Sequence, residues 1–246
     1  SIVGTDSLHQ TAKAMSASVF QVAHAALATV LGRWTGEWDL LIGVPVHGRH
    51  APEWESVVGM FVNTVALRTR LHPGLPIREA VVRARDAALA AQPHSEVPYE
   101  DVARMVRPDG REAGDPLLSV LLVNQDVVPQ SSGEVVLGGA SAGGPGPEAD
   151  AVIARLVPEY TETVDAKFDV DVVLAERDDE LHITVVHSAA VPTVVAQALL
   201  DDFRRSVVAA ATDADQPFPE VDGPDVDVIA AERVSGTAVA PTGAGA

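Results

Sequence analysis

The sequence contains no cysteine among its 246 residues. This absence excludes disulfide bonds, thiolate nucleophiles and thiolate metal ligands within the chain. A cysteine-free composition fits a reducing compartment, and we expect a cytoplasmic location.

Basic residues are also scarce: 17 Lys and Arg stand against 35 Asp and Glu, which gives a net charge of −18. Binding to nucleic acid requires a basic surface that displaces counterions from phosphates, and anionic membrane surfaces attract the same kind of surface. Long apolar runs are missing too, because no stretch approaches the roughly 20 residues of a membrane-spanning helix. We therefore expect neither a nucleic-acid partner nor a membrane.

Apolar residues, by contrast, make up 47% of the chain, which is enough for a sizeable core. Apolar positions spaced three and four residues apart predict a helix that begins near Ser16 and ends at Gly36. The same spacing predicts helices from Pro76, over residues 98–106, and from Pro192.

Runs of β-forming residues predict strands at 39–46, 57–71, 117–124, 167–176 and 181–188. The last two form a hairpin around a turn at 177–180. The order of helices and strands predicts an α/β fold with two layers, a mixed β-sheet with helices packed on one side. The Gly-, Ser- and Pro-rich segment 130–150 is expected to be a loop with a short central strand. The acidic segment 213–246 is expected to be a linker that follows a folded unit at 1–212.

Several segments, taken in order, resemble the condensation domain of nonribosomal peptide synthetases. The similar segments are "LLIGVPVHGR" (40–49), "VGMFVNTVALR" (58–68), "VPYEDVARMV" (97–106), "REAGDPLLSVLLVNQD" (111–126) and "KFDVDVVLAERDDELHITVVHSA" (167–189). The second matches the Gly-x-Phe-Val-Asn-Thr motif of that family. A further segment, "VDVIAAER" (226–233), resembles the stretch that leads into an adenylation domain.

The resemblance implies the C-terminal lobe of a chloramphenicol-acetyltransferase-like fold, which has two lobes with a tunnel between them. In that fold an acceptor amine attacks a donor thioester and forms a peptide bond. The family motif His-His-x-x-x-Asp-Gly belongs to the N-terminal lobe, and this sequence has no adjacent histidine pair. The chain alone is therefore expected to have no catalytic residue and no activity.

The same resemblance implies the partners. These are the N-terminal lobe of the domain, the donor and acceptor peptidyl carrier domains, and an adjacent adenylation domain. Phosphopantetheine would be carried by the carrier domains, and no cofactor would be bound directly. The isolated chain is expected to expose apolar surface near 57–68 and 117–125 and to self-associate.

Two arginines are candidates for a salt bridge between the lobes. In the family, an arginine of the C-terminal lobe pairs with the Asp of the histidine motif, and Arg49 and then Arg68 fit this role. A bidentate guanidinium–carboxylate pair would hold the histidine loop in place. The alternative for each is an ordinary solvated arginine.

Four polar residues on strands are candidates for lining the tunnel: Asn63, Thr64, Asn124 and Gln125. The alternative for the first pair is a β-bulge, and for the second pair a turn at the end of a strand.

Other polar groups favour structural roles. His47 and His50 have the spacing of two zinc ligands, but no third ligand or supporting shell is evident, so we expect no metal site. Asp165, Asp169 and Asp171 are expected to form a solvated row of charges. Two other functions stay open, a non-catalytic module that docks carrier domains and part of a related epimerization domain.

Overall fold

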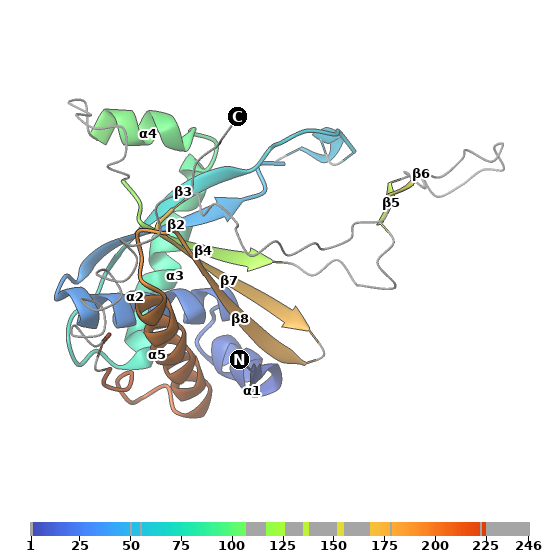
Figure 1. The fold of residues 1–246 in the computed structure, drawn as a ribbon. Helices are drawn as coiled ribbons and strands as arrows, with labels where there is room; N and C mark the ends of the chain where they lie inside the picture. The colour runs from blue at the N-terminus through green and yellow to red at the C-terminus, as the bar shows by residue number, and fades with distance from the viewer. Residues whose placement is uncertain are drawn as a thin grey trace, which may run out of the picture.

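The computed structural model describes residues 2–49, 51–54, 56–106, 117–125, 135–137, 152–154, 168–177, 179–221 and 223–224. Its centre is a six-stranded sheet in the order β1-β8-β7-β4-β2-β3 (Figure 1). The strands are β1 (Ile2–Gly4), β2 (Asp39–Val46), β3 (Asn63–Arg70), β4 (Val120–Gln125), β7 (Val170–Arg177) and β8 (Glu180–His187). Strands β2, β4 and β7 run parallel, and the other neighbours pair antiparallel. The predicted mixed sheet is confirmed.

Helices cover one side of this sheet. They are α1 (Thr5–Ala14), α2 (Val19–Thr35), α3 (Ile77–Ala91) and α5 (Thr193–Thr212). They pack on one another and on the sheet, and the main core lies between the two layers (Figure 1). The short helix α4 (Tyr99–Val106) lies apart from this layer, and two 3-10 turns, η1 (Pro52–Trp54) and η2 (Gln92–His94), complete the helical elements of the described chain.

Helix α2 forms as the sequence predicts because both of its ends are capped. Ser18 accepts a hydrogen bond from the backbone N–H of Gln21, whose side chain accepts one in return from the Ser18 N–H. At the other end Gly36 takes a left-handed conformation with φ of 76°, which ends the helix. Most of the helix is buried, and this explains its nearly uniform apolar sequence.

The strand predicted at 57–71 is wrong in its first six residues. The register of β2 and β3 runs without interruption from Asp39 opposite Arg70 to Val46 opposite Asn63, and the strand begins there. This continuous register also excludes a β-bulge at Asn63 and Thr64, which was the alternative to their tunnel role. Residues 47–49, 51–54 and 56–62, which we call the arm, leave the sheet and project from the body of the protein (Figure 1).

Two elements at the start of the chain were not predicted. Strand β1 pairs with β8, opposite residues 180–182, and α1 follows it directly. A three-residue strand carries too short a pattern for recognition by periodicity. The later hairpin was predicted closely: β7 ends at Arg177, β8 begins at Glu180, and Asp179 before it has a positive φ of 62°.

Part of the predicted linker is packed against the domain. Phe218 is 2% exposed, and the Ile77 and Arg78 backbone N–H groups donate to the carbonyls of Gln216 and Ala214. Arg33 also donates to the Phe218 carbonyl at 2.7 Å. Residues 213–221 therefore belong to the folded unit, which extends beyond the predicted boundary at 212.

The segment predicted as a loop at 130–150 contains a short strand, β5 (Val135–Leu137), which pairs with β6 (Val152–Ala154). The rest of that segment, residues 111–116 and residues 226–233 lie outside the described residues.

Within the described part of the chain, no single helix has the length and apolar content to cross a membrane. Only α1 and α2 taken together, with a bend of 90° between them, reach that length and composition.

Candidate functional site

The sheet has one side that the helix layer does not cover. Ile42, Leu122 and Val172 point into the helix layer and are fully buried. Because side chains alternate along a strand, Gly43, Leu121 and Asp171 lie on the opposite side, which we call the open side.

Helix α4 borders the open side near the edge strand β3. The Tyr99 ring meets Phe168 edge-on, with 6.2 Å between ring centres. Together α4 and β3 enclose an apolar cavity of about 330 Å³ lined by Thr64, Val65, Ala66, Ala91, His94, Val97, Tyr99 and Val102. Of the predicted tunnel residues, Thr64 thus lies at a cavity beside the edge strand β3, which the ends of α3 and η2 also line.

A straight row of residues crosses the open side from strand to strand. The register places Ala66 opposite Gly43, Gly43 beside Leu121, Leu121 beside Asp171, and Asp171 opposite Val186. At about 4.8 Å per strand, Asp171 lies roughly 10 Å from Gly43 and roughly 14 Å from Ala66. Of this row only Ala66 lines the Thr64 cavity. The side chains of Leu118 and Leu121 fill the space over Gly43, and the carboxylate lies further along.

Asp171 is only partly solvated, which corrects the prediction of a fully solvated charge at this position. Its Oδ1 atom is covered and has no hydrogen-bond partner, and this burial raises the pKa of the carboxyl group above its usual value. In the sequence, Asp171 lies between two valines on a strand and close to Asp169. This pattern is equally typical of a charge that faces solvent. Asp165 lies outside the described residues.

The arm is held together by Arg49. Its guanidinium lies 4.2 Å from the centre of the Phe61 ring, and Phe61 stacks on Trp54 at 5.9 Å. Arg49 also donates to the carbonyl of Trp54 and, at 3.3 Å, to that of Gly59. The sequence analysis singled out Arg49 but did not predict this role within the arm. The available signal was the presence of two aromatic residues, Trp54 and Phe61, within twelve positions of Arg49.

Gly48 makes this conformation of the arm possible. Its φ is +64°, and a Cβ atom at this position would lie 1.9 Å from the Phe61 carbonyl oxygen. Only glycine fits both the backbone angle and the close approach.

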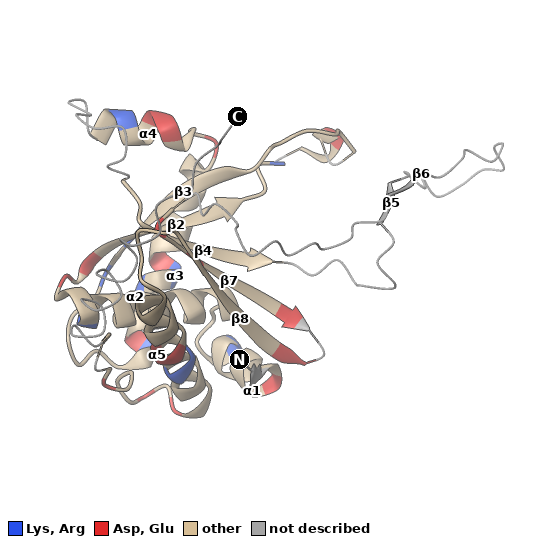
Figure 2. Cartoon of the chain, in the orientation of Figure 1, with Lys and Arg blue, Asp and Glu red and all other residues tan. Residues whose placement is uncertain are grey.

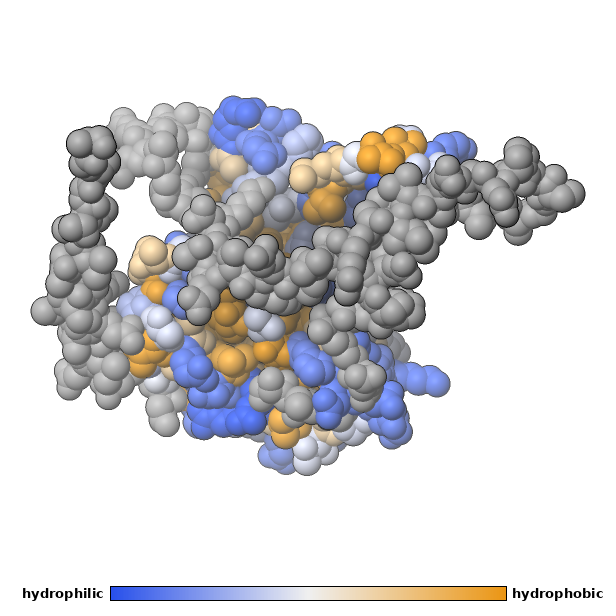
Figure 3. Space-filling view, turned by 45° about the vertical axis from the view of Figure 1, so that its right-hand side comes forward, coloured by the Kyte–Doolittle hydropathy of each residue, from blue (hydrophilic) through white to orange (hydrophobic). Residues whose placement is uncertain are grey.

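The arm presents apolar side chains to solvent. Val58 and Met60 are 99% and 93% exposed, and Val62 is also exposed. Figure 3 shows apolar residues on the arm and a second apolar patch in the middle of the same face. Exposed apolar surface of this kind marks an interaction site.

The side-chain amide of Asn63 is engaged within the chain. It donates to the carbonyls of Ser95 and Val97 at 2.8 and 2.7 Å, and its oxygen accepts from the Tyr99 N–H at 3.2 Å. In place of the predicted tunnel contact, we assign Asn63 a structural role: it fixes the turn that leads into α4.

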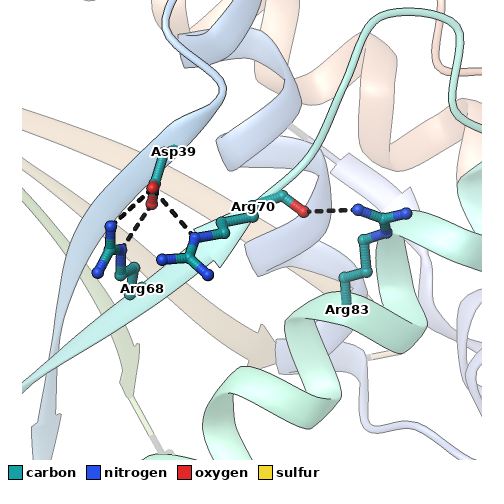
Figure 4. A network of polar contacts seen from close by, with 4 residues as sticks. All are labelled: Asp39, Arg68, Arg70 and Arg83. Carbon is teal, nitrogen blue, oxygen red and sulfur yellow. Dashed lines mark hydrogen bonds and ion pairs between the residues drawn. The ribbon is translucent and has the colours of Figure 1, made fainter.

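Arg68 also has a partner within the chain (Figure 4). It donates from Nε and Nη2 to the two carboxylate oxygens of Asp39, both at 2.8 Å, and Arg70 adds a third bond at 3.1 Å. The hydrogen bonds from Arg68, with smaller contributions from Arg70, lower the pKa of Asp39 to about 2. Arg83 donates to the Arg70 carbonyl at 3.1 Å and extends the network to α3.

Asn124 and Gln125 are adjacent in the sequence, but their side chains point to opposite sides of the sheet. They follow Leu122 at the end of β4, so Asn124 lies on the helix side and Gln125 on the open side. Asn124 lines a cavity of about 590 Å³ between α1, α2 and the strand ends. Across it the His9 ring and the Glu176 carboxylate are hydrogen-bonded at 2.8 Å, and Figure 2 shows acidic residues at this end of β7.

A third cavity, of about 360 Å³, lies on the helix side at the base of the arm. It is mostly apolar, and His47 and Arg49 lie among its lining residues. His50 lies outside the described residues, and in the described ranges no three His, Asp or Glu side chains form a group suited to a metal ion.

The sequence profile of the condensation domain matches residues 3–225, a range that begins within β1 and includes all the later strands of the main sheet and its helix layer. This chain belongs to the condensation-domain family. Its α/β fold with a mixed sheet agrees with the structures of that family, so the fold class predicted from the resemblance is confirmed.

The related proteins are large peptide synthetases. The chain is 29% identical over 183 residues to a linear gramicidin synthase of Brevibacillus parabrevis, and this match covers 74% of the present chain and 3% of the synthase. It is 28% identical over 174 residues to phosphinothricin tripeptide synthetase PhsC of Streptomyces viridochromogenes, with coverage of 71% and 14%.

Solved structures show the same fold. The first condensation domain of the CDA synthetase superposes with a TM-score of 0.65 at 22% identity, over 90% of this chain and 46% of that one. The X-domain from teicoplanin biosynthesis, solved in complex with OxyB, gives 0.67 at 22% identity, over 90% and 46%. This chain thus spans less than half of the solved chains.

Proposed function

We propose that this chain is the C-terminal lobe of a condensation domain, which forms peptide bonds between thioesters held by two carrier domains. The family match over residues 3–225 carries this proposal, because the matched chain has less than half the length of the solved condensation domains. The open side of the sheet would be one wall of the tunnel, with Thr64 in a cavity of that wall.

The chemistry would come from the other lobe. No adjacent histidine pair occurs in this sequence, so the chain alone should form no peptide bond. Within the assembled domain, its own residues would bind and orient the thioesters. The phosphopantetheine arms belong to the carrier domains, and the chain needs no cofactor of its own.

Arg49 is the better candidate for the salt bridge between the lobes. Arg68 and Asp39 already form a bidentate pair, whereas Arg49 donates to two neutral carbonyls, those of Trp54 and Gly59. A carboxylate from the other lobe would be a stronger acceptor than either carbonyl. Because Arg49 also organises the arm, the pair would link the arm to the loop that carries the catalytic histidines.

The exposed arm also supports the proposal that the isolated chain self-associates. Val58 and Met60 are almost fully exposed and lie on a projecting segment. In the assembled domain the other lobe would cover them. We expect dimers or larger species in light scattering, which the double substitution of Val58 and Met60 by Lys should convert to monomers. A strictly monomeric chain at high concentration would contradict this.

A transfer assay tests the proposal. Donor- and acceptor-loaded carrier domains are incubated with the chain alone and then with the upstream lobe added, and products are detected by mass spectrometry. Peptide product only after addition of the upstream lobe is the expected result. Product from the chain alone would overturn the proposal. Carrier binding without product in either mixture would favour the alternative, a non-catalytic docking module.

A further inference from the structure

The helix layer ends before the sheet does at the base of the arm. On the helix side, Ile42 of β2 and its partner Leu67 of β3 are buried, at 0% and 4% exposure. Because side chains alternate along a strand, Val44 and Val46 lie on this same side. Val65 lies there too, opposite Val44. These three valines are only partly buried, so the apolar face of the sheet continues beyond its cover.

The uncovered end of this face lines the cavity of about 360 Å³ at the base of the arm, which we call the arm-base cavity. Phe20, in the first turn of α2, lines it from one helix, and Ala88 and Leu89, in the last turn of α3, line it from another. Leu89 is 54% exposed. Both helices and both strands begin or end here, so the cavity lies at the margin of the helix layer, where another body can reach it.

The charges around the arm-base cavity set it apart from the rest of the chain. Among the described residues that line it, none is acidic, although the chain carries 35 Asp and Glu against 17 Lys and Arg. Arg49 also lines it, and its guanidinium donates to two neutral carbonyls. A partner that places an apolar side chain in the cavity and a carboxylate beside it would match both features.

We propose that the arm-base cavity is an anchor site, into which the upstream lobe inserts an apolar side chain next to the carboxylate that pairs with Arg49. This rests on the proposed function, because that function makes the upstream lobe the partner of Arg49. The chain covers 46% of the solved first condensation domain of the CDA synthetase. A domain of that length has a further part of similar size, which can supply the missing cover.

A pocket of this kind concentrates binding energy. At protein interfaces a few apolar or aromatic side chains that fill pockets contribute most of the affinity, and the contacts around them exclude water. The volume of about 360 Å³ is near the lower end of the range for small-molecule pockets, roughly 300–1,000 Å³, so it suits a single large side chain. The anchor and the Arg49 pair would then form one continuous contact at the base of the arm.

A first test fills the cavity from α3. Ala88 lines it, whereas Ala90 on the same helix is exposed and does not. We expect A88F to raise the dissociation constant for the upstream lobe at least about tenfold, and A90F to change it less than about twofold. Isothermal titration measures both constants, and circular dichroism checks that both variants fold.

A second measurement needs no variant. Methyl NMR spectra of the wild-type chain are recorded while the upstream lobe is added. The resonances of Val44, Val46 and Val65 should shift, and that of Val208, which is 44% exposed on α5, should not. The same spectra of the chain alone at rising concentration show whether a second copy fills the cavity instead.

Three results would overturn the inference. They are equal effects of A88F and A90F on the dissociation constant, unchanged valine resonances at saturating upstream lobe, and shifts of these resonances when the chain alone is concentrated. Peptide product from the reassembled domain together with any of these results would count against the anchor site alone. Selective weakening by A88F without product from the wild type would count against the proposed function alone.

Discussion

Arg68 and Asp39 form a bidentate ion pair across β2 and β3, with both hydrogen bonds at 2.8 Å. Both side chains are substantially exposed, so the pair contributes little to stability. The charge of Arg68 is nevertheless matched inside this chain. Its removal should therefore affect the contact between lobes less than the removal of Arg49.

We predict that R49A weakens the association with the upstream lobe at least about tenfold, the equivalent of about 1.4 kcal/mol. R68A should change this dissociation constant less than about threefold, because its partner is Asp39. Isothermal titration of each variant with the upstream lobe measures the difference. A larger effect of R68A than of R49A would assign the contact to Arg68.

Replacing Asn63 by Ala should loosen the turn before α4. Three hydrogen bonds are lost, and at roughly 0.5–1.5 kcal/mol each we expect a destabilisation of about 2–3 kcal/mol. Hydrogen exchange should increase in residues 95–106 and not in α2. T64V, at the next position, is the control. Equal effects of both substitutions would argue against the role given to Asn63.

Gly48 and Gly74 form a matched pair for testing the arm. Both have positive φ, 64° and 74°, but a Cβ atom at Gly74 would meet nothing within 4 Å. G74A should cost about 1 kcal/mol from backbone strain alone. G48A should displace the arm and change the fluorescence of Trp54, measured with Trp34 and Trp38 replaced by Phe. Similar behaviour of the two variants would show that the close approach to Phe61 is not required.

His24 should make the protein sensitive to acid. It is fully buried, bonds to Thr69 at 3.0 Å, and burial lowers its pKa from 6.5 to about 4. Between these values the unfolded chain binds a proton that the folded chain does not. Stability should therefore fall as pH drops from about 6.5 to about 4, by about 3 kcal/mol from this group.

The His24 effect is isolated by urea unfolding from pH 7 to pH 4. Other groups also titrate in this range, so the wild type is compared with H24Q, which should show a shallower pH dependence. H72Q, at an exposed histidine, should behave as the wild type does. A parallel pH dependence of H24Q and the wild type would disprove the assignment.

Ionisation of Asp171 should change the stability with pH in the opposite direction to that of His24. Burial raises its pKa in the folded state, so its ionisation costs stability as pH rises through and above its usual range. We predict that D171N melts at a higher temperature than the wild type at pH 7. This difference should close near pH 3, where the carboxyl is protonated in both states. Calorimetry at both pH values measures it, and a lower melting temperature at pH 7 would contradict it.

The sequence predicted those elements whose signals are local. Helix α2 has an apolar face, a capping box and a terminal glycine, and the β7–β8 hairpin alternates cleanly. The failures depend on contacts between distant parts of the chain. Residues 57–62 have the composition of a strand, but no partner strand continues beyond Val46 in the described sheet. Residues 213–221 have the composition of a linker, but Phe218 reaches the core.

The same distinction applies to the site. Arg49 and Thr64 were singled out because each lies in a motif that is continuous in sequence, whereas the arm was expected in part to be a strand. The partners that decide the roles of Arg68 and Asn63 lie 29 residues or more away, and no local pattern reveals them. Asp171 was misread because its strand neighbours, Leu121 and Val186, come from two other segments.

The position of β3 at the edge of the sheet has a consequence for aggregation. An edge strand offers unpaired backbone groups on which a strand of another molecule can add. The C-terminal half of β3 carries Arg68 and Arg70, whose charges oppose such growth. Helix α4 lies against the N-terminal half of the strand. The β3 edge is thereby protected along its length, so we do not expect the sheet to grow by addition of strands at this edge.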